Sequence, residues 1–125
     1  MTLIQHIGDN PARPYVEGDT LRLAVDIEDD DGQAVDLTAW GLSSARYWLS
    51  QQTAGGGFVP VAQTALGSGI NHSGGNELLI TIPAGATSGH RGVLRHELEL
   101  QSGAGMVKTV FIGRVKITPE SIPNL

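Results

Sequence analysis

Apolar side chains fall on every second residue in several segments of strand length. In residues 21–28, aliphatic side chains alternate with polar or small ones, and the aliphatic set is Leu21, Leu23, Val25 and Ile27. Residues 94–101 repeat the alternation with Leu94, His96, Leu98 and Leu100. A period of two places alternate residues on opposite faces of a strand, one facing a core and one facing solvent. No segment has a comparable helical period, so the pattern predicts an all-β protein.

Two further segments extend this pattern. Residues 42–50 place Ala45, Tyr47 and Leu49 on the inner face and Trp48 on the outer face. Residues 106–118 place Val107, Thr109, Phe111, Val115 and Ile117 inward, while Val110 and Ile112 add apolar groups to the outer face. Shorter strands are expected at residues 2–7, 58–62 and 77–82, the last with Leu78, Ile80 and Ile82 inward.

Glycine, proline and aspartate mark the connections. Tight turns are expected at Asp31-Gly32, Gly55–Gly57 and Gly103–Gly105, and Pro60 favours an edge strand because it lacks a backbone donor. Residues 67–76 predict an exposed loop, and residues 84–92 predict a crossing between sheets that can include one helical turn. About seven or eight strands spaced by about 8 to 15 residues are typical of a two-sheet sandwich. We expect one domain over residues 1–118 and an extended tail over residues 119–125.

Composition narrows the possible functions. The chain has 125 residues, no cysteine and a formal charge of −5. Its eight Lys and Arg residues form no basic stripe, which argues against nucleic acid as a partner. No apolar run approaches the roughly 20 residues of a membrane-spanning helix, and no secretory signal is visible. We therefore expect a protein that is made in the cytoplasm. We also expect it to contain no disulfides and to have no membrane partner.

The sequence predicts no cofactor, metal site or catalytic site. The acidic run from Glu28 to Gly32 suggests calcium, but an EF-hand register would put Ile27 first and Thr38 last, so a hairpin turn is the preferred interpretation. His96 falls on an apolar face, where a hydrogen-bonded histidine is more common than a ligand. No Gly-x-Ser-x-Gly elbow occurs, and glycine-rich residues 67–75 lack the helix that phosphate binding requires. We therefore expect no enzyme activity.

Four residues are candidates for partner contact. Trp40 and Trp48 can anchor a protein partner or stack on a sugar ring, although packing at the core or its rim is the alternative for both. His90 and Arg91 lie in the expected crossing loop, where they contact an anion or remain solvated.

Three pieces of the chain, in order, resemble a family of phage proteins. They are Glu17-Gly18-Asp19-Thr20-Leu21 before an alternating strand and an Asp-Asp-Gly turn, Val35-Asp36-Leu37-Thr38-Ala39-Trp40, and the final hairpin from Gly92 to Val115. This order is similar to the N-terminal domain of phage upper baseplate proteins and related tail accessory proteins. The chain differs in having Ala39-Trp40 where the pattern has glycine, and Val93-Leu94 where it has an aromatic residue.

The resemblance implies an immunoglobulin-like β-sandwich of mainly antiparallel strands. It also implies a non-enzymatic structural protein of the virion, in the tail, baseplate or head-tail junction, made in the host cytoplasm. Its partners would be other virion or tail proteins, or copies of itself in a homo-oligomer. The alternative function is a carbohydrate- or cell-surface-binding module that uses Trp40, Trp48 and the loops at one end.

Overall fold

Residues 2–3, 15–72, 74–90 and 92–118 are described by the computed structural model of the chain. Strands dominate these residues, which confirms the predicted all-β class. The elements are β1 (Thr2–Leu3), β2 (Tyr15–Val16), β3 (Leu21–Glu28), α1 (Leu37–Trp40), β4 (Leu42–Gln52), β5 (Phe58–Leu66), β6 (Gly69–Asn71), β7 (Glu77–Ile82), β8 (Gly92–Ser102) and β9 (Val107–Thr118). The predicted tail and residues 4–7 of the predicted first strand lie outside the described residues.

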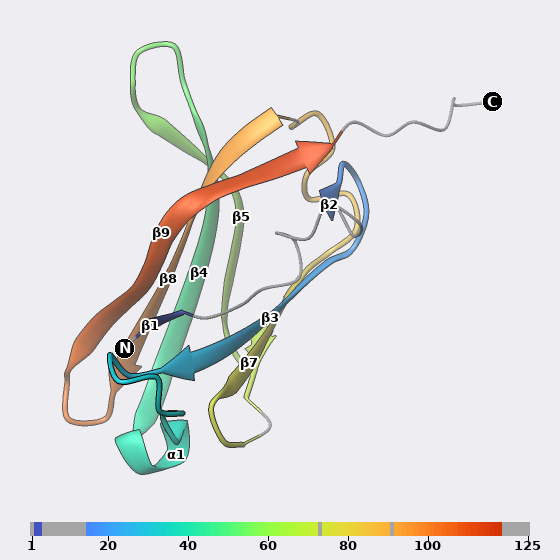
Figure 1. Ribbon diagram of the computed structural model, residues 1–125. Coiled ribbons are helices and arrows are strands. Elements are labelled where there is room, and N and C mark those ends of the chain that lie inside the picture. The colour runs from blue at the N-terminus through green and yellow to red at the C-terminus, as the bar shows by residue number, and fades with distance from the viewer. Residues whose placement is uncertain (1, 4–14, 73, 91, 119–125) are drawn as a thin grey trace.

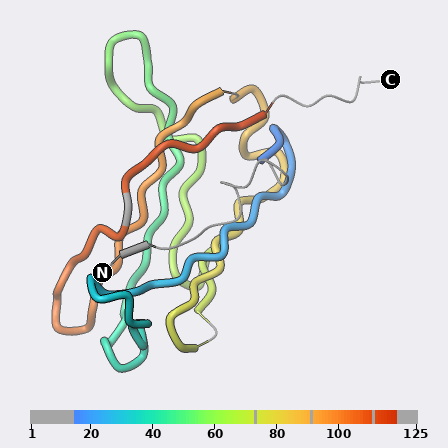
Figure 2. The backbone as a smooth tube through the Cα atoms, in the orientation of Figure 1, coloured from blue at the N-terminus to red at the C-terminus, as the bar shows by residue number. Residues whose placement is uncertain are grey.

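The strands of the described residues form one mixed sheet of nine strands, in the order β1-β3-β7-β6-β5-β4-β8-β9-β2. Most neighbours are antiparallel, whereas β2 runs parallel to β9 and β5 runs parallel to β6. The sheet curls until β1 also contacts β9, so the molecule is nearly barrel-shaped (Figure 1). β3 and β7 lie on one side of the interior, and β4, β8 and β9 lie on the other (Figure 2). The two sheets expected from the sequence are joined here because β6 connects β5 to β7.

Aliphatic side chains from both sides of the curled sheet fill the interior. Leu23 of β3 is opposite Ile80 of β7, and Tyr47 of β4 is opposite Leu98 of β8. All four are fully buried, and burying an aliphatic side chain such as Leu23, Ile80 or Leu98 contributes about 1.5 to 3 kcal/mol. The inward positions predicted for residues 21–28, 42–50, 77–82 and 94–101 are confirmed.

β9 contains a bulge that reverses part of its predicted pattern. Leu98 pairs with Phe111 and Glu99 pairs with Thr109, so Val110 is an extra residue in β9. One inserted residue moves the side chains beyond it to the opposite face. Val110 is consequently buried, with 9% of its surface exposed, whereas Val107 is 51% exposed and Thr109 is exposed as well. The predicted inward positions of Val107 and Thr109 and the outward position of Val110 are therefore wrong.

A short strand replaces the exposed loop predicted for residues 67–76. β6 lies in this stretch, and its Ile70 is buried opposite Ile80. Gly69 has a φ of +100°, and a Cβ atom there would lie 2.7 Å from Cγ2 of Thr64. Glycine is needed for this tight return of the chain, which brings the only bulky residue of the stretch into the core.

The other connections mostly agree with their predictions. Antiparallel pairing of β4 with β5 and of β8 with β9 confirms both glycine-rich hairpins. β5 pairs with β6 only at Ala65 and Leu66, so Pro60 lies where β4 is the one neighbour of β5 among the residues described. Residues 84–89 form turns, Gly92 already belongs to β8, and the described residues of this crossing include no helix.

The acidic run after β3 forms a tight turn. Gly32 has a φ of +79°, and Oδ1 of Asp29 accepts hydrogen bonds from the backbone N–H groups of Asp31 and Gln33. The chain doubles back over the single bridge between Glu28 and Ala34 and does not form a hairpin with the next strand. The predicted turn is therefore confirmed and is stabilised by Asp29, whereas the predicted hairpin is wrong.

Candidate functional site

Several exposed apolar side chains gather on one side of the molecule. The large exposed hydrophobic residues of the described chain all belong to β5, to β8, to β9 or to the hairpin between β8 and β9: Phe58, Val59, Val93, Met106, Val107 and Ile112. The solvent-facing side of β5, β4, β8 and β9 is called the outer face below. Ile112 was predicted to lie on this face, and it does so with 57% of its surface exposed.

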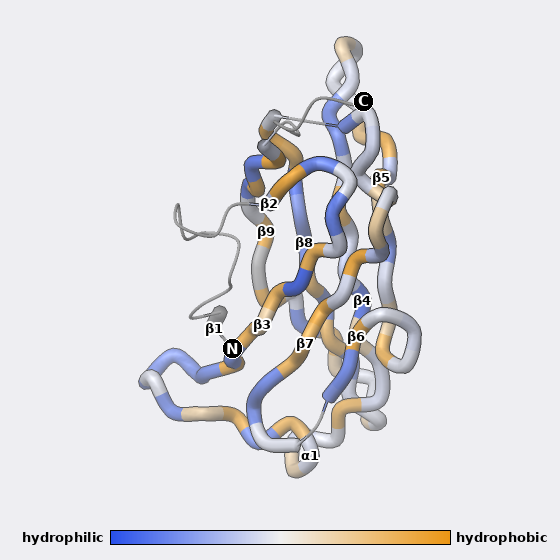
Figure 3. Tube along the Cα trace, turned by 90° about the vertical axis from the view of Figure 1, so that its right-hand side faces the viewer, coloured by the Kyte–Doolittle hydropathy of each residue, from blue (hydrophilic) through white to orange (hydrophobic). Residues whose placement is uncertain are grey.

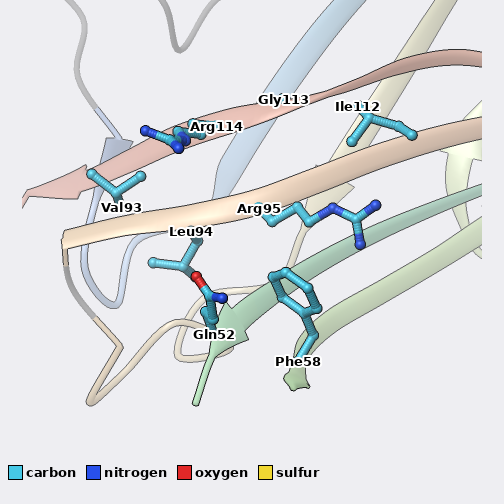
Figure 4. Close-up of a pocket in the computed structure, with 8 residues that line it drawn as sticks. All are labelled: Gln52, Phe58, Val93, Leu94, Arg95, Ile112, Gly113 and Arg114. Carbon is cyan, nitrogen blue, oxygen red and sulfur yellow. The ribbon is translucent and has the colours of Figure 1, made fainter. Parts of the chain in front are cut away.

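A pocket of about 500 Å³ opens on the outer face beside the hairpin between β4 and β5. This volume lies within the range of about 300 to 1,000 Å³ that is usual for ligand sites. The pocket mixes two arginines with apolar side chains and has no carboxylate in its lining, so it is called the basic pocket (Figure 4). Its lining residues are Gln52, Phe58, Val93, Leu94, Arg95, Ile112, Gly113 and Arg114.

The two arginines of the basic pocket occupy directly opposite positions on neighbouring strands, and their side chains extend in different directions (Figure 4). Arg95 of β8 is the direct register partner of Arg114 of β9. The guanidinium carbon of Arg95 lies 4.8 Å from the ring centroid of Phe58, and Figure 4 shows the two side chains together. Arg95 also reaches Glu97 at 3.8 Å, the outer limit of an ion pair. Arg114 is exposed and makes no ion pair within the described residues.

Two positively charged residues are thus register partners in the free chain. Like charges directly opposite each other on antiparallel strands destabilise the pairing. The interaction of Arg95 with Phe58 holds one guanidinium at the pocket, but it does not neutralise the positive charge. The basic pocket can therefore bind an anionic group, and a carboxylate would accept hydrogen bonds from a guanidinium.

Trp48 lies on the outer face, as its position in β4 predicted, and it is half-buried. The guanidinium carbon of Arg46 lies 5.0 Å from the centroid of its ring. Arg46 in turn pairs with Glu99, with 2.7 Å between Nη2 and Oε1. The ion pair holds the guanidinium against the ring, so a sugar stacking on that side of Trp48 would have to displace Arg46.

Trp40 packs against the core at the other end of β4. It ends α1, a single turn that begins after Asp36, whose side chain accepts hydrogen bonds from two backbone N–H groups. Gly41 follows in the left-handed conformation, with a φ of +86°, and ends the helix. Trp40 is half-buried against the hydrophobic cluster, which agrees with the packing interpretation.

His90, another predicted contact residue, lies far from Trp40. His90 is half-buried, and its Nδ1 lies 2.7 Å from Oε1 of Gln51, near the last residue of β4. Arg91 lies outside the described residues. Almost the whole of β4 separates Gln51 from α1, a span of about 30 Å at about 3.3 Å per residue. The structure therefore does not bring Trp40, Trp48 and His90 together into one site.

His96 is a core residue bonded to Tyr47. It is 3% exposed, and its Nδ1 lies 3.1 Å from the hydroxyl of Tyr47, with the two rings at 88°. Burial raises the pKa of Tyr47 well above its ordinary value, and the nearby Tyr15 adds to the increase. Tyr47 of β4 and His96 of β8 both point into the core, so the interpretation of His96 as a hydrogen-bonded core residue is confirmed.

Sequence reasoning missed most of the basic pocket. Phe58, Arg95 and Arg114 were not among the predicted contact residues, although Ile112 was recognised as an apolar residue on an outer face. The outward parity of Arg95 and Arg114 could be read from the alternation. Their direct opposition could not, because it depends on the register between β8 and β9.

Comparison with known protein families and with curated proteins finds no match for this chain. Within the described part, no three His, Asp or Glu side chains come together in an arrangement that could hold a metal ion. None of the helices described there is long and apolar enough to cross a membrane.

Proposed function

We propose that this chain is a non-enzymatic structural protein of a tailed phage or prophage virion. It would belong to the tail, the baseplate or the head-tail junction and act through contacts with other virion proteins. The sequence resemblance over residues 17–118 suggests this class of protein. The outer face suggests how the protein acts.

The exposed apolar side chains of the outer face carry the proposal. Val93, Ile112 and Phe58 are 60%, 57% and 46% exposed, and all three line the same pocket. Grouped exposed apolar side chains, bordered by charged ones, are characteristic of protein interaction sites. Arg46 and Glu99 supply a polar border on the same face.

The immunoglobulin-like architecture is part of the proposal, and the strand order supports it. The curled sheet divides into β1-β3-β7-β6 and β5-β4-β8-β9-β2, and only the short parallel pairing of β5 with β6 joins the two sets. Such domains have one sheet of first, second, fifth and fourth strands and another built around the third, sixth and seventh. If β1 and β2 are counted as one divided first strand, the order here corresponds to that arrangement with one additional strand, β5.

The positions of the reactive and aromatic side chains support a binding role over the alternatives. Tyr47 and His96 are used for core packing and are closed to substrate. Trp40 packs against the core, and Arg46 covers one side of Trp48. These contacts favour protein assembly over stacking on a carbohydrate.

The test is the presence of the chain in purified virions. Tailed particles from the source bacterium, produced with the gene in its natural place, would be banded on a density gradient and quantified by mass spectrometry. We expect the chain in the particle band at a fixed ratio to the tail proteins. Its recovery only from fractions without particles, or glycan binding by the isolated chain that Trp48→Ala abolishes, would contradict the proposal.

A matched pair of variants tests the outer face. Ile112→Ser removes an exposed apolar side chain from the basic pocket, and Met106→Ser removes one of similar exposure, 52%, from the hairpin at the other end of β9. Neither side chain is part of the buried core, so both variants should fold. We expect Ile112→Ser to lower incorporation into particles severalfold more than Met106→Ser does, and equal incorporation would argue against the basic pocket as the contact surface.

A further inference from the structure

We infer that the basic pocket binds the acidic turn of a second copy of this chain, so that molecules associate head to tail. The acidic turn comprises residues 28–32, Glu28-Asp29-Asp30-Asp31-Gly32. This inference supplies one contact for the proposed assembly role and rests on that role. It depends on how charge is distributed over the molecule.

Acidic residues concentrate at the end of the molecule that contains α1. Asp26 of β3 is the direct register partner of Glu77 of β7, which places two carboxylates opposite each other beside the acidic turn. Neither of them, nor Asp31, makes an ion pair within the described residues. Seven of the 13 acidic residues of the chain belong to this end: Asp26, Glu28, Asp29, Asp30, Asp31, Asp36 and Glu77.

The basic pocket lies at the opposite end. β4 starts beside α1 and ends at Gln52, a lining residue of the pocket, so the length of β4 separates the acidic turn from the pocket (Figure 1). The pocket contains Arg95 and Arg114, and Lys116 follows on the outer side of β9. Each free molecule therefore has at one end a carboxylate, Asp31, and at the other a guanidinium, Arg114, that form no ion pair with any residue the structure describes.

The acidic turn has a shape that can enter the basic pocket of another copy. It projects from the body of the molecule where the chain leaves β3 (Figure 3). Asp29 fixes its backbone through hydrogen bonds to the N–H groups of Asp31 and Gln33, which lowers the entropy lost on docking. Asp31 is exposed at the turn, so its carboxylate can pair with Arg114 of the next copy.

Complementary charge selects a second copy as the occupant. Arg95 and Arg114 both line the pocket, so a carboxylate that enters it is attracted by two positive charges, and the exposed Asp31 of the acidic turn supplies that carboxylate. The two interacting surfaces differ and lie at opposite ends, so the contact is heterologous. Repeating it gives a closed ring or an open row of molecules.

Sedimentation velocity on charge-reversed variants tests the inference. The full chain would be examined at increasing concentration in about 20 mM and about 500 mM salt, because added salt shortens the range of charge interactions. We expect concentration-dependent association at low salt and a dissociation constant at least about tenfold higher at high salt. A monomer at every concentration, or association that salt does not affect, would overturn the inference.

Exchange of charge between the two surfaces identifies the occupant. Arg114→Glu and Asp31→Lys should each remove self-association, while an equimolar mixture of the two variants should associate again, because each provides the surface that the other lacks. Arg22→Glu, an exposed reversal on β3 outside both surfaces, is the control and should associate like the unmodified chain. If the mixture stays monomeric, or if Arg22→Glu is as damaging as Arg114→Glu, the acidic turn is not the occupant.

Thermal melting separates lost contact from lost folding. Arg114→Glu places an acidic residue opposite Arg95, so its melting temperature should equal or exceed that of the unmodified chain even though association is lost. A lower melting temperature would contradict the register on which the inference depends. A chain that is present in virions but monomeric in solution would refute this inference and leave the proposed function intact. Head-to-tail association of a chain that is absent from virions would support this inference and refute the proposed function.

Discussion

Replacing Tyr47 by phenylalanine removes one buried hydroxyl and leaves an aromatic ring in the core. The hydroxyl lies 3.1 Å from Nδ1 of His96, in a part of the interior where both residues are almost fully buried. Loss of a buried hydrogen bond that leaves its partner in place costs about 1 to 3 kcal/mol. Near pH 8, we therefore expect the free energy of unfolding of Tyr47→Phe to be lower by about 1.5 kcal/mol.

The difference should shrink in alkaline solution. Burial raises the pKa of Tyr47 in the folded protein, whereas the unfolded chain keeps the ordinary value of 10.0. A raised folded-state pKa gives stability that is complete below pH 10 and is lost as the pH rises, because the unfolded chain releases this proton first. At about 1.4 kcal/mol per pK unit, the unmodified chain loses about 1.4 kcal/mol relative to Tyr47→Phe by about pH 11.

Urea unfolding followed by far-ultraviolet circular dichroism measures this effect in both proteins from about pH 8 to about pH 11. Tyr15 is present in both, so its own ionisation contributes little to the difference between them. We expect the advantage of the unmodified chain to shrink above pH 10 and to vanish near pH 11. A difference that stays constant over this range would refute the reasoning, since it would mean that the Tyr47 hydroxyl ionises equally well in both states.

Three further predictions use the same unfolding measurement. Gly69→Ala should cost at least about 2 kcal/mol more than Gly67→Ala, because both glycines have positive φ but only a side chain at 69 would collide with Thr64; equal costs would exclude the collision. Thr64→Val should raise the free energy of unfolding by about 1 kcal/mol, since the buried Thr64 hydroxyl lacks a hydrogen-bond partner in the described structure, and a loss of stability would show that it has one. Val110→Asp should cost about 3 kcal/mol or more and Val107→Asp about 0.5 kcal/mol or less, whereas the reverse order would disprove the bulge in β9.

Alternation in the sequence predicted the positions that local pairing preserves. Leu23 and Leu98 follow an unbroken period of two, and both lie in the core as expected. Val110 was assigned to the wrong face because a bulge belongs to the pairing of two strands and leaves no mark in one strand alone. Ile70 was assigned to an exposed loop because its glycine-rich neighbours resemble a linker, although burial against β7 outweighs that local preference.

The same bulge explains why the basic pocket was not predictable. The hairpin between β8 and β9 begins with Gln101 opposite Val107, and continuing that register without interruption would place Arg95 opposite Gly113. The extra residue in β9 shifts the pairing by one, so Arg95 meets Arg114 instead. The pairing of Arg95 with Arg114 depends on the extra residue Val110, four positions before Arg114. Neither the composition nor the alternation of either strand shows that such a residue is inserted.

The pairing of two positively charged residues, Arg95 and Arg114, predicts a conflict between the thermal stability of the chain and the assembly proposed for it. Any screen for thermostable forms of the isolated chain should enrich acidic or neutral residues at position 114, because they relieve the repulsion. The selected variants should associate less well, because the substitution itself would remove the charge repulsion and an acidic group of a neighbouring copy would no longer be needed for that. Engineering of this protein therefore has to measure self-association and thermal stability in the same variants.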